Sequence, residues 1–145
     1  MERHLFVYGT LMQHTDSVMA RFLHARAVSR GSAFLPGRLY DLGSYPGAVY
    51  DPEEQSMITG QVYKIQSPEE VFPTLDRYEG VIATPEIPAE YTRTLVPAQH
   101  KGQLLSCWIY LYILDTDHLP LIESGNYLEY FNQRDTHRKF IRTGR

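Results

Sequence analysis

The sequence predicts an α+β fold dominated by a curved antiparallel or mixed sheet, because segments typical of strands are many and helical signals are few. Aromatic, β-branched and aliphatic residues gather in seven candidate strands: His4–Tyr8, Ala25–Leu35, Gly37–Leu42, Ala48–Tyr50, Met57–Ile65, Tyr91–Val96 and Leu104–Leu114. Turn signals separate them: "LPG" at 35–37, "GSYPG" at 43–47, "DPEE" at 51–54 and "HKG" at 100–102. Most strands therefore lie within hairpin distance of each other.

The last candidate strand is apolar on both faces. One face carries Cys107 and Ile109, and the other carries Trp108 and Tyr110. A strand covered on both sides suits the middle of a barrel or a sheet with helices over it.

Two helices are expected. A short one begins at Asp16 or Ser17, either of which is a good N-cap, and ends at Leu23. The second begins at "SPEE", residues 67–70, where Ser67 and Glu70 have the spacing of a capping box.

A proline falls inside the second predicted helix. Pro73 would clash with the carbonyl group of Glu69, so a kink or a restart is expected there. Gly80 is suited to the C-terminal cap, which places this helix end at about residue 79.

Length and composition indicate one domain spanning residues 1–145, long enough to bury a core. The net charge of −3 gives no general attraction to nucleic acid or to an anionic membrane. The longest apolar run, residues 107–114, is too short to span a bilayer, and the N-terminus shows no signal peptide. We therefore expect a cytoplasmic protein. The basic stretch 134–145 is interpreted as a solvated, flexible tail.

The sequence offers no cofactor or metal signature. Six histidines are scattered without metal-type spacing, and no phosphate or dinucleotide fingerprint occurs. Cys107, the only cysteine, excludes an internal disulfide and is expected to be an inert core thiol. No cofactor and no metal are therefore predicted.

Two short stretches raise a functional question. In "LFVYGTL", residues 5–11, a good strand is interrupted at Gly9, and the amides of Gly9, Thr10 and Leu11 are then placed to form a small cradle for an anion. An ordinary turn after a strand is the commoner meaning of such a pattern.

The second stretch is "LDRYEGV", residues 75–81, which places Glu79 at a helix C-terminus. The helix dipole and partial burial would both raise the pKa of Glu79 toward neutrality, where a carboxyl group transfers protons best. Asp76, one turn back, is interpreted as a structural residue of the helix end. A glutamate at a helix end is usually solvated. The residues alone therefore leave two interpretations of Glu79 open, a proton-transferring carboxyl group and a solvated one.

Four motifs in order, "VYGTL" (7–11), "GQVYKI" (60–65), "LDRYEG" (75–80) and "EYTRTLV" (90–96), resemble the γ-glutamylcyclotransferase-like family. The similarity is greatest to its small members, such as γ-glutamylamine cyclotransferases. The resemblance implies a compact β-barrel with a few flanking helices. It also implies that Glu79 is the catalytic glutamate and that Tyr8, Gly9, Thr10 and Leu11 form the substrate-binding loop.

Further positions are suggested by the strand pattern and by the resemblance. Tyr91 and Arg93 alternate on one strand face. Tyr91 either lines the pocket or packs in the core, and Arg93 is expected in a surface ion pair, with a substrate carboxylate as the alternative partner. "SGNY", residues 124–127, resembles a C-terminal pocket segment of the family and suggests Tyr127 as a pocket residue. The stretch between Glu79 and Tyr91 looks longer than in many relatives and is a candidate lid.

The reaction implied is cyclisation of a γ-glutamyl amine, amide or amino acid to 5-oxoproline with release of the free amine. The partner implied is therefore a small γ-glutamyl molecule, with no role for nucleic acid or membrane. One alternative is a non-catalytic module that binds a small carboxylate or γ-glutamyl ligand on the same fold. Another is a protein-interaction domain that acts through the basic tail.

Overall fold

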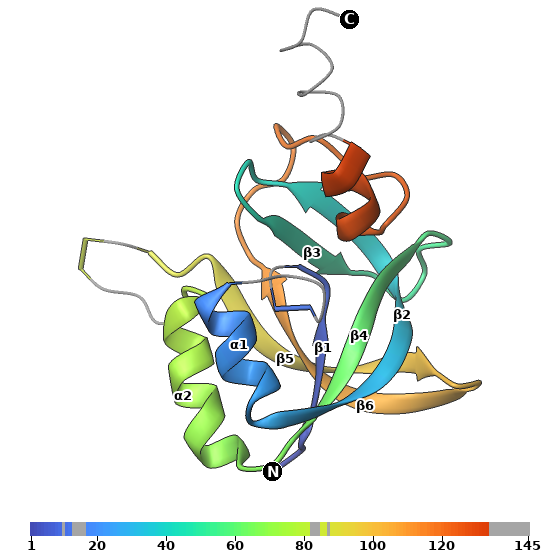
Figure 1. Cartoon of the computed structure of the whole chain (residues 1–145). Helices are drawn as coiled ribbons and strands as arrows, with labels where there is room; N and C mark the ends of the chain where they lie inside the picture. Colours follow the sequence, from blue (N-terminus) through green and yellow to red (C-terminus); the bar gives the residue numbers. More distant parts are fainter. Residues whose placement is uncertain (10, 13–16, 82–84, 87, 134–145) are drawn as a thin grey trace, which may run out of the picture.

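The computed structural model describes residues 1–9, 11–12, 17–81, 85–86 and 88–133. These residues form a β-barrel flanked by helices (Figure 1), which confirms the predicted fold class. The strands are β1 (His4–Val7), β2 (Ala27–Asp41), β3 (Pro46–Tyr50), β4 (Met57–Ile65), β5 (Tyr91–His100) and β6 (Gln103–Tyr112).

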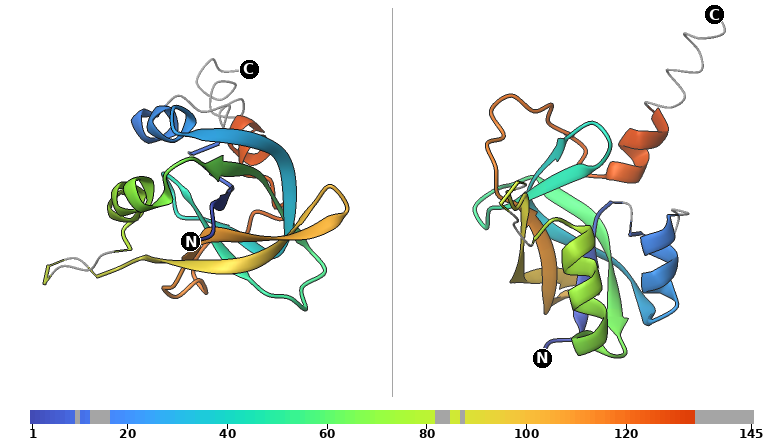
Figure 2. Two further views of the ribbon diagram at one scale, coloured as in Figure 1. Left: turned by 90° about the horizontal axis from the view of Figure 1, so that it is seen from below. Right: turned by 90° about the vertical axis from the view of Figure 1, so that its left-hand side faces the viewer.

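The described strands are hydrogen-bonded in the order β3-β2-β4-β1-β6-β5. A further pairing between Phe34 of β2 and Gln99 of β5 closes the last five of these into a barrel, and β3 is added along the second half of β2. The pairing of β1 with β6 is parallel, while the other pairings are antiparallel. Seen along the barrel, the strands curve around a shared interior (Figure 2).

Two predicted strands are one long strand, which corrects the turn expected at "LPG". β2 runs through Pro36 and Gly37 and changes partner there: Pro36 pairs with Met57 of β4 and Gly37 with Tyr50 of β3. Gly37 is needed because a Cβ atom there would lie 2.2 Å from the carbonyl oxygen of Val49. The Pro–Gly pair therefore marks a close approach of strands rather than a reversal of the chain.

The β5–β6 hairpin is longer than predicted at its closed end. β5 continues beyond Val96 to His100, and the predicted turn at "HKG" is confirmed by Lys101 and Gly102, both at positive φ. Two residues at positive φ suit the twist of a tight hairpin. At the open end, β6 stops at Tyr112, two residues earlier than expected.

Helices α1 (Val18–His24) and α2 (Pro68–Tyr78) lie side by side on one flank of the barrel (Figures 1 and 2). The side chain of Ser17 accepts a hydrogen bond from the amide of Ala20, so Ser17 is the N-cap of α1 as predicted. Of the two candidates, Asp16 lies outside the described residues.

The start of α2 differs from the prediction in two respects. Ser67 is the N-cap but its side chain makes no capping hydrogen bond, so the capping box is not formed. The helix also runs through Pro73 without a restart. Pro73 and Glu69 are on the exposed side, where water can satisfy the carbonyl group that loses its partner, while Phe72 and Leu75 anchor the buried side.

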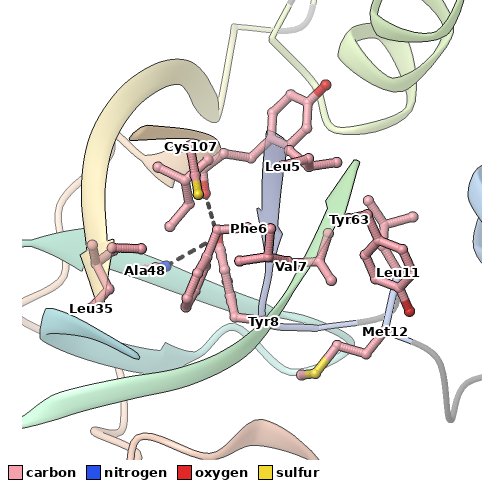
Figure 3. Close-up of a cluster of buried hydrophobic side chains, with 14 of the residues drawn as sticks. Leu5, Phe6, Val7, Tyr8, Leu11, Met12, Leu35, Ala48, Tyr63 and Cys107 are labelled. Atoms are coloured by element: carbon pink, nitrogen blue, oxygen red, sulfur yellow. Dashed lines mark hydrogen bonds between the residues drawn. The ribbon is translucent and has the colours of Figure 1, made fainter. Parts of the chain in front are cut away.

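The core packs on both faces of β1 (Figure 3). Leu5, Phe6 and Val7 are at most 3% exposed, and the buried side chains of Leu35, Tyr63 and Cys107 surround them. Burial raises the pKa of the Cys107 thiol to about 12, which agrees with the predicted inert thiol.

The segment after β6 packs across the end of β2. Amide groups of Asp41 and Ile122 join this segment to β2 by hydrogen bonds to Pro120 and Leu39, respectively. Residues 127–133 are helical and lie at this end of the barrel (Figure 1). The basic tail predicted at 134–145 lies outside the described residues.

Candidate active site

A pocket of about 400 Å³ lies where the end of β1, the end of α2 and the start of β5 meet. Its walls come from residues 6–9 and 11, 44–46, 78–80 and 90–91, together with Tyr110 of β6. The two stretches singled out in the sequence, "LFVYGTL" and "LDRYEGV", therefore contribute to one pocket.

Glu79 reaches the pocket because α2 ends there. It is the C-cap residue of α2, and Gly80 follows with φ 72°. The amides of Gly80 and Val81 donate back to the carbonyl groups of Arg77 and Asp76, at 3.4 and 3.0 Å. This is a Schellman motif, which requires a left-handed residue and so a glycine at the position that the sequence predicted.

The surroundings of the Glu79 carboxyl group disfavour its charged form. Protein atoms surround it on most sides, although the residue remains partly accessible through the pocket. Burial raises the pKa of Glu79 to about 7, because the charged form loses hydration. Among the described residues, no side chain or amide forms a hydrogen bond or ion pair with this carboxyl group to compensate. It is therefore free to exchange a proton with a bound molecule near neutral pH.

Buried tyrosines fix the wall opposite the helix end. The hydroxyl group of Tyr8 donates to the carbonyl oxygen of Tyr110 and accepts from the amide of Ala48 (Figure 3). The hydroxyl group of Tyr91 donates to the carbonyl oxygen of Pro46 at 2.7 Å. Because these hydroxyl groups are used in holding three strands together, we assign Tyr8 and Tyr91 to shaping the pocket.

Gly9 is required by close packing. A Cβ atom at this position would lie 2.8 Å from Cγ of Pro46. The absent side chain thus lets the end of β1 lie against the same proline that holds Tyr91. In the described part of the chain, no hydrogen bond uses the amide groups of Gly9 or Leu11, so both remain available to a ligand.

Asp76 has the structural role that the sequence favoured. Arg93 donates to its two carboxylate oxygens at 2.8 and 3.2 Å, and the hydroxyl group of Tyr110 donates at 2.7 Å. The guanidinium group of Arg93 also lies over the rings of Phe72 and Trp108. This network ties α2 to β5 and β6, and so holds the helix end that carries Glu79.

The structure brings most of the predicted site residues together. Glu79, Tyr8, Gly9, Leu11 and Tyr91 all line the pocket. Thr10 lies outside the described residues, as does much of the candidate lid, namely residues 82–84 and 87.

Tyr127 is placed elsewhere. It is 5% exposed, belongs to the hydrophobic core and lies with its ring tilted by 40° against that of Phe131, and it does not contribute to the pocket wall described above. Its suggested part in substrate binding has no support from this position.

Sequence reasoning missed Glu90 and Tyr110 as pocket residues. Glu90 directly precedes Tyr91, a residue already considered, and this adjacency was the available signal. Tyr110 lines the pocket only because β6 pairs with β1 and with β5, a long-range arrangement that short motifs do not show.

The described residues contain neither a metal-type cluster nor a helix suited to span a membrane. No group of three or more histidine, cysteine, aspartate or glutamate side chains is placed to hold a metal ion. None of the helices in this part of the chain has both the length and the apolar character needed to cross a bilayer.

Fold and site together define a small β-barrel protein with a carboxyl-containing pocket beside a glycine loop. Residues 5–129 match the family model described as "Gamma-glutamyl cyclotransferase, AIG2-like". The chain belongs to this family.

Named relatives agree with the family match. The chain is 34% identical over 126 residues to the γ-glutamylcyclotransferase family protein YtfP of Escherichia coli K12, covering 86% of this chain and 96% of the relative. The solution structure of YtfP from E. coli superposes with a TM-score of 0.63 at 30% identity, over 88% of this chain and 97% of that one. A mouse AIG2-like protein superposes with a TM-score of 0.63 at 26% identity, over 84% and 86% of the two chains.

Proposed function

We propose that this protein is a γ-glutamyl cyclotransferase, which converts a γ-glutamyl amine, amide or amino acid into 5-oxoproline and the free amine. The observation that carries the proposal is the carboxyl group of Glu79. It lies in the pocket without a hydrogen-bond or ion-pair partner among the described residues, and burial raises its pKa to about 7. Family membership supports the same class of reaction.

The proposed chemistry balances with one acid–base group. Glu79 accepts a proton from the α-ammonium group of the substrate, and the freed amine attacks the γ-carbonyl carbon of the same molecule. A C–N bond closes the five-membered ring, and the original γ-amide C–N bond breaks. Glu79 then delivers this proton to the leaving nitrogen, which departs as an amine. The carboxylate so formed takes the second proton from the ring nitrogen and passes it to the released amine or to water, which restores the starting state.

The nucleophile in this reaction is part of the substrate. This agrees with a pocket wall whose described residues include no cysteine, histidine or lysine. The main task of the protein is to hold the folded-back conformer of the substrate, and a pocket of about 400 Å³ is suited to that.

The available amide groups of Gly9 and Leu11 provide the complementary donors. We assign them to an anionic oxygen of the substrate, either its α-carboxylate or the oxyanion that develops on the γ-carbonyl group. Backbone donors that are fixed before the reaction stabilise such charge without reorganising.

Turnover of defined substrates tests the proposal. Wild-type protein is incubated with γ-glutamyl amino acids, ε-(γ-glutamyl)lysine and simple γ-glutamylamines, and 5-oxoproline and free amine are quantified together. The proposal predicts equimolar release of the two products from at least one compound. Thermal stabilisation by these compounds without release would contradict it and would support the non-catalytic binding module instead.

A further inference from the structure

The last residue of α1 is hydrogen-bonded to the loop that follows β1. Nε2 of His24 lies 3.0 Å from the carbonyl oxygen of Leu11 and 3.2 Å from the hydroxyl oxygen of Tyr63. Because a carbonyl oxygen can only accept, Nε2 must carry the ring hydrogen and donate it to Leu11. No residue of α1 is among the described residues that line the pocket, so this contact is what links the helix to the site.

Strand β4 holds the imidazole ring of His24 in place. The ring stacks on Tyr63, with the two centroids 5.2 Å apart and the planes inclined by 19°. Tyr63 is 2% exposed, and its hydroxyl group donates to Oε1 of Gln61 at 3.2 Å, which leaves the hydroxyl oxygen to accept from His24. Since β4 pairs with β1, the ring has a fixed position relative to the strand that leads into the loop.

The peptide group between Leu11 and Met12 is held at both ends. Its N–H group donates to the carbonyl oxygen of Gly9 at 3.0 Å, which closes a turn. Its carbonyl group accepts from His24, and this is the only hydrogen bond of that carbonyl group within the described part of the chain. Without His24 the peptide group could rotate, and the amide groups of Gly9 and Leu11 would lose their fixed directions.

We propose that His24 is a positioning residue of the site: by fixing the peptide group after Leu11, it keeps the amide groups of Gly9 and Leu11 directed at an anionic oxygen of the substrate. The part that these amide groups play in the reaction rests on the proposed function, whereas the effect of His24 on the loop does not. Donors that are fixed in advance save the free energy of ordering the loop when the substrate binds and reacts.

Two substitutions separate the hydrogen bond from the ring. His24→Phe keeps an aromatic ring against Tyr63 but removes the donor, and it is expected to lower kcat/KM for 5-oxoproline release about tenfold. His24→Gln removes the ring but keeps an N–H donor at a similar distance from the backbone, and it is expected to retain most of the wild-type value. Equal kcat/KM for the wild type and His24→Phe, or an equal loss in the two variants, overturns the inference.

His100→Phe is the matched control. Nε2 of His100 lies 2.7 Å from the carbonyl oxygen of Arg30, so the control removes a hydrogen bond of the same kind, and neither residue lines the pocket. It should keep the wild-type kcat/KM. A loss in His100→Phe as large as that in His24→Phe would show a general effect of losing such a bond, and would overturn the positioning role.

NMR spectroscopy tests the loop without turnover. Two-bond proton–nitrogen correlation spectra of the wild type are expected to show the Nε2–H tautomer of the neutral His24 ring. Hydrogen exchange of the Met12 amide is expected to be about tenfold faster in His24→Phe than in the wild type, and unchanged in His100→Phe.

These spectra also distinguish failure of the positioning role from failure of the proposed function. If no γ-glutamyl compound releases 5-oxoproline, the proposed function fails. The positioning role then stands if both NMR results are obtained. It falls if His24 is the Nδ1–H tautomer, or if exchange of the Met12 amide is the same in His24→Phe as in the wild type.

Discussion

Replacing Glu79 by glutamine is expected to lower kcat/KM for 5-oxoproline release by roughly 10²–10⁴-fold, the usual contribution of a positioned acid–base group. Glutamine keeps the shape of the side chain but cannot take the proton from the substrate's ammonium group. The carboxyl group makes no hydrogen bond or ion pair with the described residues, so its removal breaks no structural contact there. The loss of activity should therefore not result from unfolding of the variant.

The assay compares initial rates of 5-oxoproline release for the wild type, Glu79→Gln and the exposed control Glu86→Gln. The control should retain wild-type rates. Equal rates for the wild type and Glu79→Gln would remove Glu79 from the reaction, even if the protein proved to be a cyclotransferase.

The same substitution is expected to change how stability depends on pH. The pKa of Glu79 is about 7 in the folded protein against a reference value of 4.5. Between these values the folded state holds a proton that the unfolded state has lost, so the free energy of unfolding falls as pH rises. The difference of about 2.5 pKa units corresponds to a loss of roughly 3 kcal/mol on passing from below pH 4.5 to above pH 7.

Chemical denaturation of the wild type and Glu79→Gln, at a series of pH values from 4.5 to 8.5, isolates this contribution. Titration of the other groups is common to both proteins and cancels in the difference. Glu79→Gln should gain stability relative to the wild type as pH rises, with most of the change between pH 5 and 7. A difference that does not vary with pH would show that Glu79 is well hydrated in the folded protein.

Local chemistry explains which parts of the fold the sequence predicted well. Ser17 as an N-cap, Gly80 after α2 and the hairpin at Lys101 and Gly102 each depend on a few adjacent residues. The prediction was wrong at Pro36 and Gly37 because long-range strand pairing outweighs the local preference there. These residues are typical of a turn, but pairing with two different strands keeps the segment extended.

The residues of the candidate site also differ in how far the sequence alone could reveal them. Glu79 and Gly9 could be singled out because each combines a reactive or permissive residue with a recognisable strand end or helix end. The sequence alone could not show why residue 9 must be glycine. The residue that leaves no room for a side chain there is Pro46, which is distant in sequence. The hydrogen bond between Tyr45 and Glu90, and the proximity of Tyr110, likewise depend on the closure of the barrel.

The most direct test of the central claim, that a buried glutamate with a raised pKa transfers the proton, is the pH profile of kcat/KM for 5-oxoproline release by the wild type. The ionised form of Glu79 must accept the first proton. The rate should therefore fall about tenfold per pH unit below an apparent pKa of about 7, the value that burial gives Glu79. A rate that stays constant down to pH 5, with its acid limb near the ordinary pKa of a glutamate, would contradict the account.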